Sequence, residues 1–126
     1  MKLNLDCIRD VMLEAEKQPF GEELTFHSLK LQLNNYSEDE LAYTCIKLKE
    51  AGLITAMIIN ADNFTHVQFI NDITYEGHQF LANIHSDNIW KKTKSVLGEI
   101  GSTSISTVIQ VASGVVQSVI SAKLGH

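Results

Sequence analysis

The spacing of apolar and polar residues along the chain predicts a mixture of helices and strands. Apolar side chains recur every three or four residues in four stretches, which is the period of a helix with one buried face. These predicted helices are Asn4–Lys17, the stretch between Ser37 and Gly52, Thr74–His85 and Asp87–Ile100. Two runs rich in β-branched residues, Leu53–Asn60 and Thr65–Ile70, flank Ala61–Phe64 and predict a β-hairpin.

Local signals define the ends of the two helices that flank this hairpin. Ser37 with Glu40 three residues later is a capping box, which satisfies backbone donors at a helix start. Gly52 stands where a helix needs a left-handed residue at its end. Thr74 is the expected N-cap of the helix after the hairpin. Gly77 lowers the propensity of that helix, and we expect it to permit a close approach to the sheet.

The segment Glu22–Asn35 follows a different pattern. Apolar and polar residues alternate through Leu24–His27 and again through Leu29–Leu33. Around Ser28 this alternation shifts by one residue, so the apolar residues move from even to odd positions. Alternation is typical of strands. We therefore expect one or two short strands here, the first pairing with the hairpin, and a missing or degenerate helix.

The last segment, Ser102–Leu124, combines a helical period with residues that form helices poorly. Its apolar residues fall on one side of a helical wheel and small polar residues on the other, but most of the apolar ones are β-branched. Such a helix needs support from its own domain or from another chain, and we favour self-association in a symmetric dimer. The expected interface residues are Ile105, Val108, Ile109, Ala112, Val115, Val116, Val119 and Ile120.

Two motifs resemble the winged-helix domain of bacterial transcriptional regulators. Leu48–Ile54 is similar to the end of a recognition helix running into the wing, and Ile73–Leu81 is similar to the helix that follows the wing. A broader set of segments resembles a small family of phage- and prophage-associated bacterial proteins of unknown function. Those segments are Met1–Arg9, Tyr36–Glu40, Thr74–Leu81 and Asp87–Lys92. The resemblance implies a winged-helix-like fold and a mobile-element setting, and it brings no catalytic residues.

Together these patterns predict an α+β fold in two parts. Residues 1–86 are expected to form a winged-helix-like domain, in the order helix, short strand, helix, two-stranded wing and helix. Residues 87–126 are expected to form a C-terminal helical extension that mediates self-association.

Charge argues against simple DNA binding. The 126-residue chain has a net charge of −5, whereas DNA-binding surfaces are usually basic. The presumed recognition helix begins with Glu38, Asp39 and Glu40, and the chain from Leu53 to Ile73 contains no Lys or Arg. The lysines that could contact a partner or nucleic acid are Lys47, Lys49, Lys91, Lys92 and Lys94, joined by Lys30 if a dimer assembles them into one surface.

No pattern indicates an enzyme. The sequence lacks a glycine-rich phosphate loop and the common metal motifs, so we expect no catalytic residues, no cofactor and no metal. Cys7 and Cys45 lie on predicted apolar helix faces and are interpreted as reduced core thiols. His66, His78 and His85 are too scattered to predict a metal site. The start of the chain does not resemble a secretory signal, and no uninterrupted apolar run reaches about 18 residues, so we expect a cytoplasmic protein with no membrane contact.

Two functions remain open. The first is a non-enzymatic accessory or regulatory protein of phage or prophage origin that acts mainly through protein–protein contacts as a homodimer. The alternative is a DNA-binding transcriptional regulator that uses a dimer-assembled basic surface. An enzyme ranks third.

Overall fold

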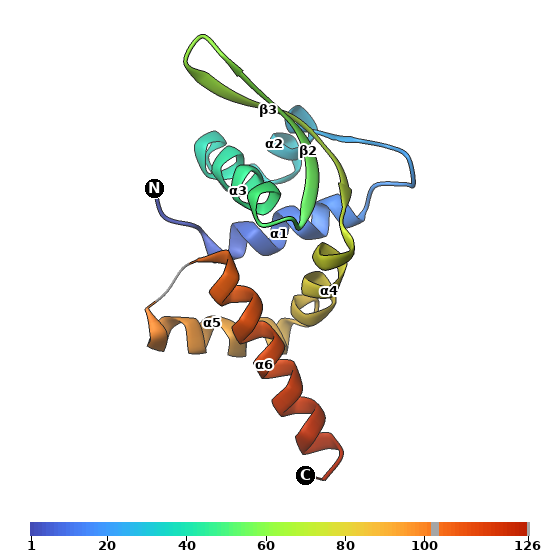
Figure 1. Ribbon diagram of the computed structural model, residues 1–126, viewed down its shortest axis with the longest axis vertical. Helices are drawn as coiled ribbons and strands as arrows, with labels where there is room; N and C mark the ends of the chain where they lie inside the picture. The colour runs from blue at the N-terminus through green and yellow to red at the C-terminus, as the bar shows by residue number, and fades with distance from the viewer. Residues whose placement is uncertain (102–103, 126) are drawn as a thin grey trace.

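The computed structural model describes residues 1–101 and 104–125, which form a mixed α+β fold (Figure 1). In chain order its elements are α1 (Leu5–Glu16), β1 (Leu24–Thr25), α2 (Phe26–Gln32), α3 (Glu38–Glu50), β2 (Ile54–Ala61), β3 (Phe64–Ile73), α4 (Tyr75–Ile84), α5 (Asp87–Ile100) and α6 (Ile105–Lys123). The predicted helices that became α1, α3, α4 and α5 are confirmed to within a few residues.

The strands form one antiparallel sheet in the order β1-β3-β2. The short strand β1 pairs with β3 through Leu24 opposite Ile70, and β2 pairs with β3 over its whole length. Asp62 and Asn63 connect β2 to β3 with φ angles of 52° and 66°. Positive φ at both residues is what a two-residue type I′ hairpin requires. The predicted hairpin is therefore confirmed, as is its pairing with a short strand upstream.

A bulge in β3 changes which of its residues face the core. Met57 of β2 opposes Phe69, but the next residue of β2 opposes Val67, so Gln68 is an extra residue on β3. Val67 and Ile70 are buried, whereas Met57 is exposed. Phe69 lies opposite Met57 in the register and therefore faces outward with it. In a regular strand Val67 and Phe69 would face the core together, but the extra residue reverses the alternation between them.

The predicted absence of a helix before α3 is also wrong. The side-chain oxygen of Thr25 accepts a hydrogen bond from the Ser28 amide at 3.1 Å and caps α2. Phe26, Leu29 and Leu33 then follow at intervals of three and four residues, and Leu29 and Leu33 are buried. The one-residue shift of the alternation around Ser28 reflects this helix. Only the first two residues of the alternating pattern form a strand.

The turn after α3 and the start of α4 are joined by hydrogen bonds and close packing. The Thr74 hydroxyl donates to the Gly52 carbonyl at 2.5 Å and accepts from the Gly77 amide at 3.0 Å. A Cβ on Gly77 would overlap the Leu53 carbonyl oxygen and lie 2.7 Å from Cγ2 of Ile73. The close approach predicted at Gly77 is therefore confirmed, and it explains why the two winged-helix-like motifs lie in contact.

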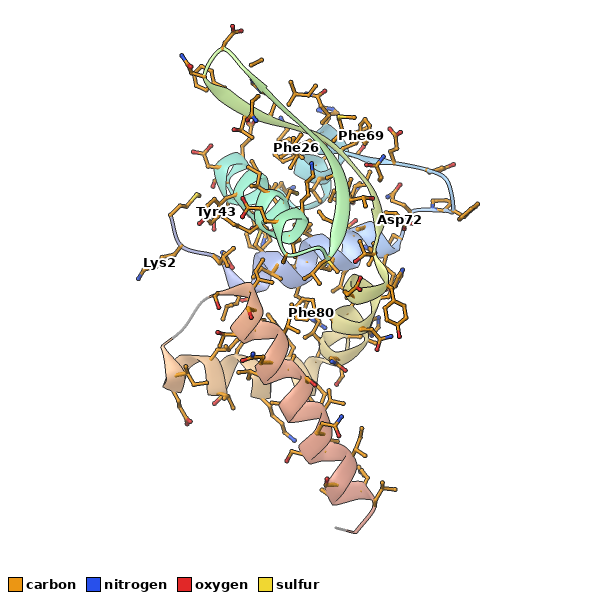
Figure 2. All side chains as sticks on the ribbon, in the orientation of Figure 1. Lys2, Phe26, Tyr43, Phe69, Asp72 and Phe80 are labelled. Carbon is orange, nitrogen blue, oxygen red and sulfur yellow. The ribbon has the colours of Figure 1, made fainter. Side chains whose placement is uncertain are left out.

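The buried core continues from α1–α4 into the last two helices. Phe80 of α4, labelled in Figure 2, is 1% exposed, and Trp90 and Leu97 of α5 are also buried. On α6, Ile105, Val108 and Ala112 join the same core. The C-terminal half of α6 continues past the other helices (Figure 1).

The C-terminal helix begins slightly later than the predicted segment Ser102–Leu124. The side chain of Ser104 caps α6 by accepting from the Thr107 amide at 3.1 Å, and the helix ends at Lys123. The first two residues of the prediction, 102 and 103, lie outside the described residues.

Candidate interaction surfaces

Residues in the segments that resemble the phage-associated family contact one another and hold the helices together. The Asn4 side chain caps α1 and donates to Oε2 of Glu40 at 2.8 Å, which joins α1 to the capping box of α3. The hydrogen bond from Asn4 lowers the pKa of Glu40. The Tyr36 hydroxyl donates to Oδ2 of Asp10 at 2.6 Å. Burial and the contact with Asp10 raise the pKa of Tyr36. These residues therefore have structural roles.

A second group of motif residues fixes α5 against α1. Trp90 Nε1 and Lys94 Nζ each donate to Oδ1 of Asp6 at 2.9 Å. Burial alone would raise the pKa of Asp6, but these two hydrogen bonds and the neighbouring positive charges lower it. Arg9 donates to the carbonyls of Ile84 and His85 at the end of α4, and it also pairs with Asp87 at 2.9 Å. Trp90 thus docks α5 on its own domain.

The first turn of α3 presents acids to solvent. Glu38 and Asp39 are exposed, and Glu40 is partly exposed while it completes the capping box. Acids at a helix N-terminus are stabilised by the helix dipole. Lys30 of α2 lies 3.6 Å from Glu38, so one of the candidate lysines partly offsets this acidic turn.

The candidate lysines lie on three separate helices, and Lys30 is the one on α2. Lys47 and Lys49 are in the last turn of α3, and Lys47 pairs with Glu50 at 2.9 Å. The other candidates are on α5, where Lys94 is held by Asp6 and Lys91 and Lys92 are exposed. Figure 1 shows α1 between α3 and α5. One copy of the chain therefore does not bring the α3 and α5 lysines together.

The outward face of the β2–β3 hairpin is an apolar surface that the sequence analysis did not identify. Met57, Ile59 and Phe64 are 48%, 43% and 68% exposed. His66 lies opposite Ile59 in the register, and its ring is 6.3 Å from that of Phe64. The hairpin tip projects beyond the helices (Figure 1). The signal was present in the uncharged run of Leu53–Ala61, but strand alternation alone does not show which side is covered.

The predicted self-association stripe on α6 is divided between two environments. Ile105, Val108 and Ala112 are buried by the chain's own core. The other members are partly or largely exposed, and they are Ile109, Val115, Val116, Val119 and Ile120. Val115 and Val119 line a hollow of about 280 Å³ with Val96 of α5. A second copy could therefore reach only the C-terminal part of the stripe.

The average apolarity of α6 is high. By length and composition alone, this helix is long and apolar enough to cross a membrane, and most of its residues lie outside the core. The sequence contains no uninterrupted apolar run here, because serines and glutamines interleave with the valines and isoleucines. The expectation of no membrane contact stays a prediction, because length and composition alone do not show that a helix spans a membrane.

Other hollows have mixed linings. One of about 540 Å³ lies between the N-terminal segment, α3 and the start of α6, and is lined by Lys2 and Tyr43 (Figure 2) together with Lys47 and Glu50. Another of about 280 Å³ lies between the segment after α1 and the end of β3, where Asp72 lines it. Within residues 1–101 and 104–125, no group of three or more His, Cys, Asp or Glu side chains is arranged to hold a metal.

Both cysteines are buried and free. Burial raises the pKa of Cys7 to about 11 and that of Cys45 to about 12. The Thr44 hydroxyl donates to Sγ of Cys7 at 3.3 Å. Because the thiolate is the nucleophilic form, both side chains are unreactive near neutral pH. This agrees with the interpretation of reduced core thiols.

Comparison with known proteins gives two matches. The profile of a family described as "Hypothetical protein (DUF2513)" matches residues 2–104. An uncharacterized protein of Haemophilus influenzae is 29% identical over 125 residues, which is 98% of this chain and 99% of that protein. No solved structure matches the chain. The family profile ends before α6, whereas the similarity to the Haemophilus protein includes it.

Proposed function

This chain belongs to the family described as hypothetical protein (DUF2513), and from the surfaces above we propose that it is a non-enzymatic accessory or regulatory protein of the cytoplasm. Its fold is winged-helix-like, its origin is a phage or prophage, and it acts mainly through protein–protein contacts. The order of α1, β1, α2, α3 and the β2–β3 hairpin supports the winged-helix assignment. In that arrangement, α3 is the counterpart of the recognition helix and the hairpin is the wing.

The observation that carries this proposal is the chemistry of the two elements that would touch DNA. The first turn of α3 is acidic, and the hairpin has an apolar outward face without Lys or Arg. A helix that reads DNA places its N-terminal residues between two rows of phosphates. Carboxylates there are repelled, whereas an uncharged apolar surface suits contact with protein.

Homodimerisation through α6 is part of the proposal. The C-terminal half of the helix presents valines and isoleucines with few charged neighbours, and Lys123 is the basic residue of its last turn. Ser and Gln side chains on the opposite face, together with the packing of the first half on the domain, favour a protein contact over a lipid contact.

An electrophoretic mobility experiment tests the protein-binding proposal against DNA binding. The full chain is titrated at low salt into random-sequence duplexes and into duplexes from neighbouring prophage DNA. We expect no shift at concentrations of about 10 µM, near the range of nonspecific binding by basic proteins. Tight binding that weakens steeply with added salt would contradict the proposal.

A DNA-binding regulator is the second candidate, and the presence of α2 favours it. The α2–α3 pair has the connectivity of a helix-turn-helix, which the sequence pattern did not predict. In that case a dimer would assemble the exposed Lys49, Lys91 and Lys92 into one basic surface. Replacing these three lysines by Glu would then abolish any mobility shift, whereas a shift that persisted would exclude this surface.

A further inference from the structure

The outer edge of β2 is available for another strand. The sheet order β1-β3-β2 places β2 at the margin, and within the described part of the chain no strand pairs with its outer side. An edge strand presents unpaired backbone N–H and C=O groups along that side. The register shifts both place the extra residue on β3, at Gln68 and Asn71, so β2 itself stays regular.

This edge lacks the features that normally prevent strand addition. Protective edges carry charged residues, proline or a bulge. From Ile54 to Ala61, β2 has no charged residue, no proline and no glycine, and the first acid is Asp62 in the turn. Met57 and Ile59 are about half exposed on the outward side. Backbone hydrogen bonds and apolar contacts are therefore both available to an added strand.

The inward side of the same strand adjoins a hollow. Ile58 and Asn60 of β2 line about 410 Å³ of open space with Ile46, Lys49 and Glu50 of α3. That volume accommodates a few side chains and is far too small for a second folded domain. Lys49 and Glu50 bring opposite charges to its margin, so the hollow favours neither an acidic nor a basic occupant.

We propose that the β2 edge binds an extended, largely uncharged segment of another protein, which adds to the sheet as a fourth strand. Alternate side chains of the segment lie against Met57 and Ile59 outside and towards Ile46 and Ile58 inside. This mode of recognition combines main-chain hydrogen bonds with pockets for every second side chain. The inference rests on the proposed protein-binding function and names the surface and the chemistry of the partner.

Selection from a random library of 12-residue peptides displayed on phage tests this inference with the full chain as target. Selected sequences are synthesised, and their affinity is measured by fluorescence anisotropy. We expect alternating apolar residues, and at least about a tenfold loss of affinity for the Met57→Lys/Ile59→Lys variant, because lysines at an edge oppose strand addition. Hydrogen exchange should show new protection confined to the amides of β2.

Leu31→Lys is the matched control, because Leu31 is a 62% exposed apolar residue that lies on α2 and not on the β2 edge. It should change affinity by less than about twofold. If thermal melting shows that the double variant is destabilised, Ile59→Lys alone is used, with the same expectation.

Peptides that bind the edge variants with unchanged affinity would overturn the inference. A selection that yields no binding peptide would overturn it as well. The former result would leave the wider protein-binding function standing. A full-chain dimer that the edge variants dissociate would also overturn it, because the occupant would then be a second copy. DNA binding in the mobility experiment would contradict the proposed function without altering the peptide result.

Discussion

Gly77 shows how one absent side chain sets the packing of α4. At an unconstrained helix position, replacing glycine by alanine stabilises the helix by about 1 kcal/mol. At Gly77, however, a Cβ would overlap the carbonyl oxygen of Leu53. We expect Gly77→Ala to lower the free energy of unfolding by about 1–3 kcal/mol, and Gly77→Val by more. Urea denaturation measures this. Gly98→Ala on α5, where nothing lies within 4 Å, is the control and should be neutral or stabilising.

Asp6 links the stability of the docked α5 to pH. Its pKa is lower in the folded protein than the ordinary value of 3.8. A group of this kind stabilises the fold above its unfolded pKa, and the contribution is lost as pH falls through the folded pKa. Asp6→Asn should therefore destabilise the protein at pH 7 and flatten the loss of stability below about pH 4.

Urea midpoints measured from pH 7 to about pH 2 test the role of Asp6, since the linkage acts across that range. Asp62→Asn is the control, because Asp62 is an exposed turn residue with positive φ that asparagine also adopts readily. Parallel pH profiles for the wild type and Asp6→Asn would exclude the proposed linkage.

Among the elements, those with strong local signals were predictable. The capping box at Ser37 and the glycine at position 52 defined α3, and the β-rich runs defined the hairpin. The helix α2 was missed because two residues of strand lead directly into seven residues of helix, so the alternation in Leu24–His27 spans both. The bulge at Gln68 was not predicted, because it is determined by the pairing of β3 with β2 and not by any local property of the sequence.

The cap of α2 can be tested at Thr25. Its side-chain oxygen accepts from the Ser28 amide, and loss of an N-cap costs about 1 kcal/mol. Thr25→Ala should lower the free energy of unfolding by that amount in thermal or urea denaturation. Thr25→Ser keeps the accepting oxygen and should retain most of the stability. Equal losses in both variants would assign the effect to the methyl group of Thr25 and not to the cap.

At the scale of the whole molecule, the sequence pattern favoured self-association of α6, although a stripe of apolar residues suits packing on its own domain almost as well as packing on a second chain. The structure places Ile105, Val108 and Ala112 in the core, which the helical period alone could not show. Ending the chain at residue 100 would therefore remove part of the core together with any interface. Point substitutions are the better test of self-association.

We predict that the C-terminal half of α6 forms a symmetric dimer. Val116 and Ile120 lie one turn apart, and Ile120 is 44% exposed. Burying several such side chains yields about 1.5–3 kcal/mol each at full burial, and a two-fold contact is the commonest way for identical chains to achieve this. Light scattering of the full chain should show a dimer at about 10–50 µM, a range that detects micromolar affinities.

Val116→Asp/Ile120→Asp should convert that dimer to a monomer, because dimerisation would bury four uncompensated carboxylates. Gln117→Asp adds one carboxylate per chain on the exposed polar face and should leave the dimer intact, since Gln117 is outside the stripe. A wild-type monomer throughout this concentration range would mean that the partly exposed valines and isoleucines of α6 have no partner in a second copy. The dimer would then have to be abandoned, while the β2 edge would remain a separate surface for another protein.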